Sequence, residues 1–265
     1  MVPNLRVRLY SVSPERTRAV GELVEWREGG WSFLALQEWS EPLPGLVRSV
    51  AADRYPPSWE RRSCGRDFIV IAPLGAGHRQ AVIRPYRRGG AVGKVVRSTY
   101  WGWRPRCFAE IRCLVELSQR DIPVAPPVGA AVRWRPAWFY EAWLVTQYVE
   151  GSSSLWEWLQ RCPPAQERRQ VIDDLGRVLA NFHRTGARHP DLNLHNVLVQ
   201  SRGQELRVWL VDLDRVALAR TPTNPQPSLA RLWRSARKLD PQQRYWTRAD
   251  QQALEDAVEV RFAGR

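Results

Sequence analysis

The sequence predicts an α+β fold of two lobes, with a β-rich N-terminal lobe and a reduced, mainly helical C-terminal lobe. Short apolar runs separated by glycine and proline dominate residues 66–149, and apolar residues at helical spacing follow in residues 163–186. A boundary between the lobes is therefore expected near residues 149 and 150, so that residues 150–265 form the second lobe. Residues 1–65 are predicted to be weak strands and loops that extend the first lobe, because prolines interrupt their apolar alternation.

The composition fits a folded domain with an acidic partner. The chain has 265 residues, of which 44% are hydrophobic, and a formal net charge of +13. That charge favours nucleic acid, an anionic membrane surface or a phosphorylated substrate, and it does not choose among them. No run of 18 apolar residues occurs and the N-terminus lacks the apolar core of a signal peptide, so we expect a chain that does not cross a membrane. The four cysteines have no metal-type spacing and are expected to be reduced thiols.

A β-hairpin with a glycine-bearing tip is predicted at the start of the N-terminal lobe. Phe68–Ile71 and Ala81–Arg84 are its two strands, and Gly75 and Gly77 lie in the turn between them. Glycine lets backbone N–H groups approach a phosphate closely. An ordinary hairpin turn is the alternative for this tip, because two glycines alone are a weak signal.

A helix and a strand complete the N-terminal lobe. The helix follows Arg104-Pro105, and its apolar residues fall on one face with Glu110 at the flank. The strand Ala142–Val149 follows a proline-rich passage, and its end is expected to be the hinge between the lobes.

The C-terminal lobe is predicted to begin with two helices, the second of which starts at Pro163-Pro164 and is capped by Gly186. His183 extends the apolar face of that helix and is expected to be a core histidine. His189 and His195 are expected to hydrogen-bond the backbone of the following loop. The helix has apolar residues at helical spacing, namely Val171, Ile172, Leu175, Val178, Leu179 and Phe182.

A second hairpin is predicted next to this loop. Val197–Val199 and Val208–Val211 are its strands, joined by a turn at residues 200–204. The hairpin is expected to bring Asn196 and Asp212 together at one of its ends. Acidic residues at strand ends can also be ordinary solvated turn formers, which is the alternative.

The polar residues around this hairpin follow the order of a phosphoryl-transfer site. Asp191 lies two residues after His189, Asn196 lies five residues after Asp191, and Asp212 ends a buried strand. This is the arrangement of a protein-kinase-like fold, in which one Asp orients the attacking hydroxyl and the Asn and second Asp hold Mg²⁺ on ATP. The pattern therefore predicts Asp191 as the catalytic base and Asn196 and Asp212 as metal ligands.

The same fold assigns nucleotide contacts to the N-terminal lobe. Gly75 and Gly77 are expected to cover the ATP phosphates, and Arg84 stands where such folds usually place a phosphate-binding lysine. A guanidinium can do this electrostatic work in a bidentate geometry. Lys94 is the rival for the role of Arg84.

Two further elements complete the predicted nucleotide site. Glu110 is expected to pair with the phosphate-binding arginine, and we place it ahead of Glu116, although a solvated surface glutamate is the alternative. The backbone of Gln147, Tyr148 and Val149 is expected to hydrogen-bond the adenine. A buried strand without a role in binding is the alternative for that segment.

The chain also resembles the Kdo/lipopolysaccharide-core kinase family over roughly residues 66–240. The resemblance implies ATP- and Mg²⁺-dependent phosphorylation of the Kdo sugar on a lipid A precursor, an anionic glycolipid, at the cytoplasmic face of a Gram-negative inner membrane. Pro190 inside the catalytic loop and the unmatched residues 1–65 depart from the pattern. The matching stretches are Arg84–Gly90 with Gly93-Lys94, Phe108–Leu117, Asp121–Pro127, Asp191–Asn196, Val208–Asp214 and Ser228–Leu239.

Two surface features favour a lipid-linked acceptor with peripheral membrane contact. A basic and aromatic cluster and one face of a later helix are suited to anionic headgroups. A solvated surface with tryptophans partly in the core is the alternative for the cluster. The cluster comprises Lys94, Arg97, Tyr100, Trp101, Trp103, Arg104 and Arg106, and the helix face comprises Arg231, Arg234 and Lys238.

Other functions remain open at this point. Asn193 replaces the lysine usual in protein kinases and no Ala-Pro-Glu element follows Asp214, so a protein acceptor is not expected. Another small-molecule phosphotransferase of the aminoglycoside type, or a basic kinase-like scaffold without catalysis, would fit the same core. Nucleic-acid binding would explain the net positive charge but not the presence of Asp191, Asn196 and Asp212, so nucleic acid is not expected as a partner.

Overall fold

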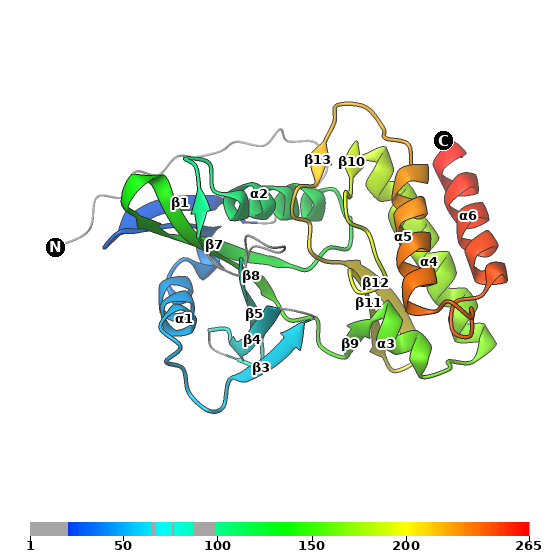
Figure 1. The fold of residues 1–265 in the computed structure, drawn as a ribbon, viewed down its shortest axis with the longest axis horizontal. Helices are drawn as coiled ribbons and strands as arrows, with labels where there is room; N and C mark the ends of the chain where they lie inside the picture. The colour runs from blue at the N-terminus through cyan, green and yellow to red at the C-terminus, as the bar shows by residue number, and fades with distance from the viewer. Residues whose placement is uncertain (1–20, 65–66, 76, 87–98, 265) are drawn as a thin grey trace. The chain divides into compact units, whose positions relative to one another are not determined.

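The computed structural model describes residues 21–64, 67–75, 77–86 and 99–264 (Figure 1). The chain divides into two compact units. The first comprises Met1–Val115 and Pro126–Tyr148, and the second comprises Glu116–Ala125 and Val149–Arg265. Within the described residues, no helix is both long and apolar enough to span a bilayer.

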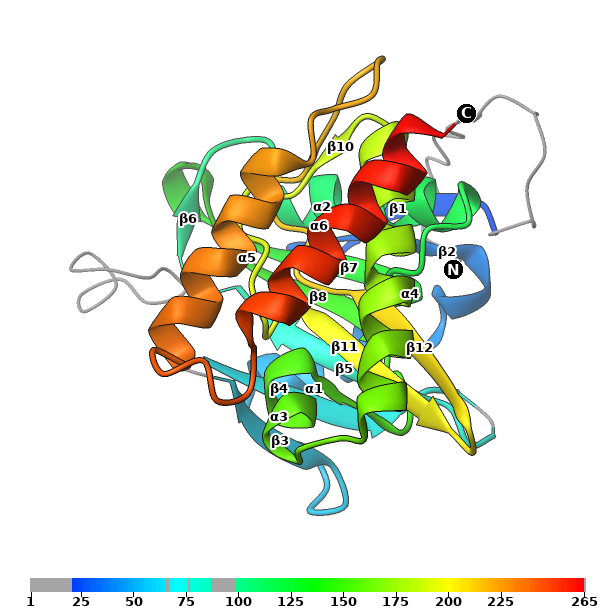
Figure 2. The ribbon, with the colours of Figure 1, turned by 90° about the vertical axis from the view of Figure 1, so that its right-hand side faces the viewer.

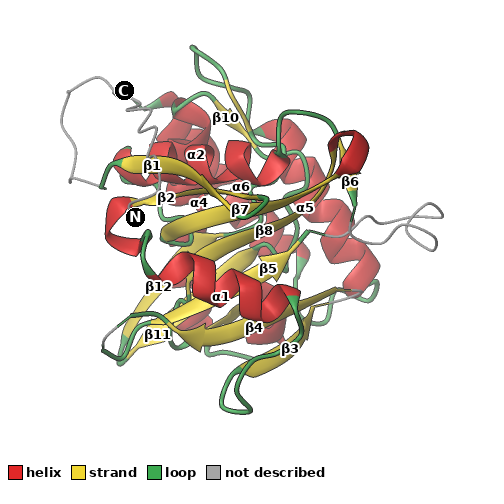
Figure 3. Ribbon diagram, turned by 90° about the vertical axis from the view of Figure 1, so that its left-hand side faces the viewer, coloured by secondary structure: helices red, strands yellow, loops and turns green. Residues whose placement is uncertain are grey.

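The first unit is built on one antiparallel sheet of eight strands. The strand order is β1-β2-β7-β8-β5-β4-β3, and β6 also pairs with β8 (Figure 3). Non-consecutive neighbours such as β2 and β7 tie distant parts of the sequence together. The strands are β1 Leu23–Glu28, β2 Trp31–Leu36, β3 Glu60–Cys64, β4 Asp67–Pro73, β5 Gln80–Pro85, β6 Tyr100–Trp101, β7 Pro127–Arg135 and β8 Phe139–Gln147.

Two helices lie against opposite faces of this sheet. Arg84 and Ala130 share one face, because both are cross-strand partners of Leu144, and this face meets α2 (Arg106–Gln119) through Glu110. The other helix, α1 (Pro42–Ala51), contacts β5 and β7, and Figure 3 shows it in front of the strands. The sheet therefore has a helix on each side, and successive residues of its central strands β2 and β7 are buried on both faces.

The expectation of only weak strands and loops in residues 1–65 is wrong for α1. Pro42 begins the helix, where a missing N–H needs no partner and the fixed φ of proline suits the first turn. Leu43, Leu46, Val47 and Val50 then recur at helical spacing and are all buried. The prolines mark the start of a helix here, because Pro42 and Pro44 both lie in its first turn, where the backbone N–H groups have no partner within the helix.

The second unit contains small sheets covered by helices. Strand β11 lies between β12 and β9, and β10 pairs with β13. Figure 2 shows α6 alongside α4 and α5, and Trp233 of α5 donates to Glu255 of α6 at 2.7 Å. The predicted long helix before the catalytic loop is confirmed as α4. The elements are β9 Ser152–Ser154, α3 Leu155–Gln160, α4 Ala165–Arg184, β10 Ala187–Arg188, β11 Val197–Arg202, β12 Glu205–Leu210, β13 Ala217–Leu218, α5 Gln226–Leu239 and α6 Arg248–Ala263.

Helices α4 and α6 approach one another closely at Gly176. A Cβ added there would lie 2.6 Å from the Cβ of Ala257, which is nearer than Cβ atoms come in real structures. Only glycine fits at this point of α4 without moving α6. The two helices can therefore pack closely here, and Leu254 and Val258 of α6 are buried.

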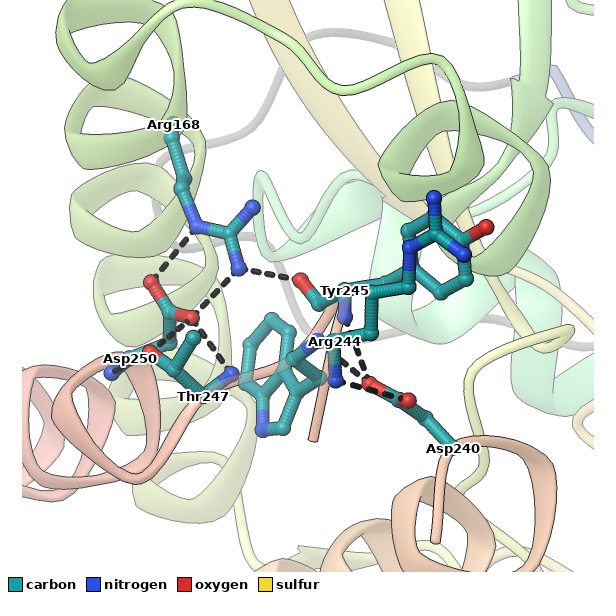
Figure 4. Close-up of polar contacts among 7 residues, drawn as sticks. Arg168, Asp240, Arg244, Tyr245, Thr247 and Asp250 are labelled. Carbon is teal, nitrogen blue, oxygen red and sulfur yellow. Dashed lines mark hydrogen bonds and ion pairs between the residues drawn. The ribbon is translucent and has the colours of Figure 1, made fainter. Parts of the chain in front are cut away.

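A polar network holds the connection between α5 and α6 (Figure 4). Asp240, at the end of α5, accepts hydrogen bonds from the backbone N–H groups of residues 244–246. Arg168 of α4 donates to Asp250 of α6, with 2.7 Å between Nε and Oδ1, and also to the carbonyl of Tyr245. Burial opposes ionisation of Asp250, but hydrogen bonds from Arg168 and neighbouring groups outweigh it and lower the pKa of this carboxyl. The network fixes the end of α5 relative to α4 and α6.

The α+β class predicted from the sequence is confirmed by this mixture of antiparallel sheet and packed helices. Cys107, Cys113 and Cys162 are thiols and not disulfides, as expected.

Candidate active site

The loop that carries Asp191 is held by its own polar groups. The Asp191 N–H donates to Nδ1 of His189 at 3.2 Å, and the Asp191 carbonyl accepts from the side-chain amides of Asn193 and Asn196 at 3.0 and 2.9 Å. Leu192 and Leu194 are buried, which anchors the loop on the side away from the solvent. The Asp191 side chain is left 65% exposed. The loop thus presents a carboxylate to water on a fixed backbone.

His189 links this loop to the residue before Asp212. It is buried, and its Nε2 lies 3.5 Å from the carbonyl oxygen of Val211. Burial lowers the pKa of His189, so the ring is neutral near pH 7. Because Nδ1 accepts from the Asp191 N–H, the ring proton is on Nε2 and points to Val211. The structural role expected for this histidine is confirmed.

The predicted hairpin places Asn196 and Asp212 at one end. In β11 and β12 the first pair is Val197 with Leu210, and the Val211 N–H donates to the Asn196 carbonyl at 3.0 Å. Asp212 follows directly with φ of 58°, which turns the chain out of the strand direction. Asn196 in turn contacts the Asp191 carbonyl through its amide nitrogen. The structure therefore brings Asp191, Asn196 and Asp212 together within the second unit.

Residues 123–125 brace the strand that leads to Asp212. The Leu210 N–H donates to the Pro123 carbonyl at 2.8 Å, and the Ala125 N–H donates to the Leu210 carbonyl at 3.1 Å. Through this short parallel bridge, the Asp121–Pro127 stretch supports the end of β12, two residues before the candidate metal ligand Asp212. No local signal in the sequence indicated that pairing.

Sequence reasoning missed one partner of Asp191. Arg231 of α5 forms an ion pair with it, with 2.5 Å between a terminal guanidinium nitrogen and Oδ1. One turn further along α5, the Ser235 hydroxyl accepts from the Leu194 N–H at 3.4 Å. The sequence had grouped Arg231 with residues that meet an acidic lipid. The (i, i+4) spacing of residues 231 and 235 puts both on one helix face, but nothing local shows that this face meets the loop.

The first unit contains a buried arginine–glutamate pair. One Arg84 guanidinium nitrogen lies 2.8 Å from each carboxylate oxygen of Glu110, and the Tyr86 hydroxyl also donates to this carboxylate. The Glu110 side chain is 1% exposed. Burial and the negative charge of Glu110 raise the pKa of Tyr86 well above its usual value, so the phenol stays protonated and donates. The expected pairing of Arg84 with Glu110 is present in the structure.

The glycine tip between β4 and β5 adopts backbone angles that favour glycine. Gly75 has φ of 65° and Gly77 has φ of 114°, both in the region that side chains disfavour. The Leu74 N–H donates to the Arg79 carbonyl at 2.9 Å and closes the turn. Lys94, the rival of Arg84, lies outside the described residues.

Two of the three backbone amides expected at the adenine already have acceptors in the first unit. The Gln147 N–H donates to Pro126 at 2.8 Å, and the Tyr148 N–H donates to Gln80 at 2.7 Å. For the N–H of Val149, the described residues offer no backbone acceptor. Val149 is therefore the amide of this segment best able to bind a ligand.

The oxygen donors at the hairpin end fit a small hard cation. The described residues contain no cluster of three or more His, Cys, Asp or Glu side chains that could bind a metal by themselves. The two donors here would therefore share the cation with other ligands. Asn196, whose amide nitrogen is engaged with the Asp191 carbonyl, offers its oxygen, and Asp212 offers a carboxylate. Mg²⁺ takes one or two protein ligands of this kind together with phosphate oxygens and water. The donor set therefore suits Mg²⁺ on a nucleotide better than a metal caged by protein alone.

Comparison with known proteins gives consistent matches. The model of the lipopolysaccharide kinase (Kdo/WaaP) family matches residues 71–257. A 3-deoxy-D-manno-octulosonic acid kinase of Xylella fastidiosa (strain 9a5c) is 38% identical over 181 residues, covering 66% of this chain and 67% of the relative. Its counterpart in Xanthomonas campestris pv. campestris (strain B100) is 39% identical over 179 residues, with the same coverage.

A solved structure shares the fold. WaaP in complex with acyl carrier protein aligns with a TM-score of 0.55 and 16% sequence identity, covering 84% of this chain and 85% of that chain. At this identity the likeness concerns the fold alone, and it confirms the predicted kinase-like fold. The family match spans every candidate residue from Gly75 to Asp212.

Proposed function

Because the chain belongs to the lipopolysaccharide kinase (Kdo/WaaP) family, we propose that it is an ATP-dependent kinase of the Kdo sugar of a lipid A precursor. Its reaction is the transfer of a phosphoryl group to an alcohol in lipopolysaccharide core biosynthesis. The observation that carries this proposal is the convergence of Asp191, Asn196 and Asp212 in a chain that resembles Kdo kinases along most of its length.

Asp191 acts as the catalytic base. Its carboxylate is exposed and held on a rigid loop, so an acceptor hydroxyl can reach it and donate a hydrogen bond. Asp191 orients this hydroxyl for in-line attack on the γ-phosphoryl group and takes its proton. Arg231 keeps the carboxylate in one orientation until the acceptor arrives.

Asn196 and Asp212 would hold Mg²⁺ through one amide and one carboxylate oxygen. When bound, the ion shields the negative charge that otherwise repels the attacking oxygen from the phosphates. The hydrogen bonds between Asn196 and Asp191 and between Val211 and Asn196 fix the spacing of these groups before substrates bind. Such preorganisation is where a phosphoryl-transfer enzyme gains most of its rate.

The remaining contacts bind the nucleotide. Gly75 and Gly77 present backbone N–H groups to the phosphates, and Arg84, braced by Glu110, neutralises their charge. The adenine is expected at the backbone of residues 147–149, with the Val149 N–H as its main donor.

The lobes assigned from the sequence, residues 66–149 and 150–265, are proposed as the N- and C-terminal lobes of this kinase. The division into compact units between Tyr148 and Val149 supports that boundary, and residues 116–125 group with the second unit. Strands β1 and β2 share the sheet of β5 and β8, which supports including residues 21–65 in the N-terminal lobe.

The acceptor is proposed to be an anionic glycolipid, reached by peripheral contact at the cytoplasmic face of the inner membrane. The net charge of +13 supports an acidic, membrane-linked acceptor. Nucleic acid is not proposed as a partner.

One assay tests the proposed function. Purified protein is incubated with ATP, Mg²⁺ and Kdo-bearing lipid A precursor, and the product is read by mass spectrometry. We expect the acceptor to gain one phosphoryl group, and we expect chelation of Mg²⁺ to prevent it. Transfer to an aminoglycoside with none to the Kdo lipid would replace this acceptor by the aminoglycoside-type alternative. Absence of transfer to every acceptor tested would favour a scaffold without catalysis.

A further inference from the structure

One edge of the first unit gathers exposed aromatic side chains that the catalytic assignment does not use. Trp101 and Trp103 are each 69% exposed, Trp138 is 66% exposed and Phe139 is 40% exposed. The only other large apolar side chain exposed to this degree among the described residues is Val260. We call these four residues the aromatic patch. A concentration of exposed aromatic groups in one place indicates an interaction surface, since isolated exposed apolar groups are normally scattered.

The fold assembles the aromatic patch from two distant segments. Trp101 of β6 is the cross-strand partner of Phe139 of β8, and the Gly102 N–H donates to the Trp138 carbonyl at 3.1 Å. Strand β6 pairs with the first residues of β8, and Figure 3 shows it at that end of the sheet. Of these four residues, the basic and aromatic cluster predicted from the sequence contains Trp101 and Trp103. Pairing through the sheet adds Trp138 and Phe139, which lie more than thirty residues later in the chain.

The turn that presents Trp138 is held in a disfavoured backbone conformation. Ala137 has φ of 58° and Trp138 has φ of 61°, in the left-handed region that residues with a side chain rarely adopt. The short connection between β7 and β8 therefore keeps a tryptophan exposed at the expense of backbone strain.

Arginines surround the aromatic patch. The guanidinium carbon of exposed Arg104 lies 4.3 Å from the centroid of the Trp103 ring. Arg135 is exposed where the turn begins, and Glu141 nearby pairs with both Arg133 and Arg135. Two arginines share that one carboxylate, so the surroundings of the patch are net positive.

We propose that the aromatic patch docks this protein onto an anionic lipid bilayer, with the tryptophan rings at headgroup level and Arg104 and Arg135 against lipid phosphates. Tryptophan beside arginine is the combination that membrane–water interfaces select, because indole is amphipathic and the guanidinium meets phosphate. Three of the four side chains are tryptophan and none is aliphatic, which favours a bilayer over a protein groove. The inference rests on the proposed function and deepens it, since it states how the kinase would reach an acceptor embedded in a membrane.

Vesicle sedimentation tests this surface. The full-length protein is mixed with vesicles of phosphatidylcholine, either alone or containing phosphatidylglycerol, and the bound fraction is measured. We expect binding to the anionic vesicles that weakens in high salt. A double variant, Trp103→Ser with Trp138→Asn, should bind about tenfold more weakly or worse, and Arg104→Glu should lower binding by a similar factor. Asparagine is chosen at position 138 because it tolerates the left-handed conformation.

Matched controls come from the second unit. Val260→Ser removes an exposed apolar side chain, and Arg169→Glu reverses an exposed arginine, both on helices outside the patch. Both controls should bind vesicles as the wild type does. Equal binding by the patch variants and the wild type, or no wild-type binding to anionic vesicles, would overturn the proposal. So would a lipid-free dimer, seen by sedimentation velocity, that the double variant abolishes, because the patch would then serve a second copy of the chain.

A second readout separates this inference from the proposed kinase activity. The patch variants should phosphorylate a water-soluble, deacylated Kdo oligosaccharide at the wild-type rate and lose activity only on acceptor embedded in vesicles. Wild-type protein that binds vesicles but phosphorylates neither acceptor would refute the proposed function and leave the docking surface standing. Patch variants that are as active as wild type on embedded acceptor would refute the docking surface alone.

Discussion

Two arginine–carboxylate pairs accompany the candidate catalytic groups, and they differ in their access to water. In the first unit, the Glu110 carboxylate bonded to Arg84 is 1% exposed and also accepts from Tyr86. In the second unit, the Asp191 carboxylate bonded to Arg231 is 65% exposed. A buried carboxylate that loses its partner is left uncompensated, whereas an exposed one is quickly hydrated.

The buried pair is therefore suited to be a permanent structural contact, and the exposed pair is suited to exchange its partner. The Arg84–Glu110 pair is suited to hold a phosphate-binding cation in one place throughout the reaction. The Arg231–Asp191 pair can open at little cost in free energy, so Asp191 can change its partner from arginine to an acceptor hydroxyl. The following predictions test that distinction, starting with the largest expected effect.

Replacing Asp191 by asparagine should remove the base without harming the fold. We expect kcat to fall by roughly 10²- to 10⁴-fold, with the free energy of unfolding changed by less than about 1 kcal/mol. Steady-state kinetics and urea unfolding measure the two effects. Asp173→Asn is the control, because Asp173 is also exposed and pairs with Arg261 at 2.6 Å. An Asp191→Asn variant as active as the control would remove Asp191 from the mechanism.

Replacing Glu110 by glutamine should damage both stability and nucleotide binding. Arg84 would lose its charged partner inside the protein, so we expect the free energy of unfolding to fall by ~3 kcal/mol. The KM for ATP should rise, because Arg84 would no longer be held. In the control Glu141→Gln, the carboxylate that pairs with Arg133 and Arg135 is 15% exposed, so a smaller loss of stability and an unchanged KM are expected. Equal effects at both sites would show that burial does not set the role of the Glu110 pair.

His183 extends the comparison to a buried group whose charge depends on pH. The residue is fully buried in α4, and burial lowers its pKa to about 4. Between pH 6.5 and 4 the unfolded chain binds the proton more readily, so stability falls as the pH falls. From about pH 7.5 to about pH 5 this loss should be about 2 kcal/mol. His183→Asn should reduce the pH dependence of urea unfolding by that amount, and an unchanged slope would contradict it.

Replacing Arg231 by glutamine should have the smallest and most selective effect. We expect kcat to fall about tenfold with an unchanged KM for ATP, because Arg231 positions Asp191 and is not assigned to the nucleotide. Stability should change by less than about 1 kcal/mol. Arg261→Gln breaks a comparable exposed pair with Asp173 and should leave kcat unchanged. Arg231→Lys should restore much of the rate, and similar kcat values for Arg231→Gln and Arg261→Gln would exclude the positioning role.

The sequence predicted the parts of the site that depend on short spacing. Asn196 and Asp212 flank a hairpin, and hairpin register follows from the alternation of its apolar residues. The pairing of Arg84 with Glu110 followed from the order of elements in kinase-like folds. These predictions succeed because a few residues of chain, or a recurring order, determine them.

Features that depend on contacts between elements far apart in the chain could not be predicted from short spacing or from the order of elements. Arg231 looked like any other exposed cation on α5, because its meeting with Asp191 depends on how α5 packs. Trp138 joins Trp101 only through the pairing of β6 with β8. The bridge of residues 123–125 to Leu210 likewise has no local signature, since any short extended segment can form it.

The contact of α4 with α6 at Gly176 offers a way to control the enzyme from a distance. An alanine there would press on Ala257 and push α6 outward, which would pull Asp250 away from Arg168 and loosen the end of α5. Activity would then be lost through melting of a helix pair, at a temperature set by the size of the new side chain. Cells carrying such an allele would switch from a working to a failing kinase on warming, with every group that handles nucleotide or sugar still intact.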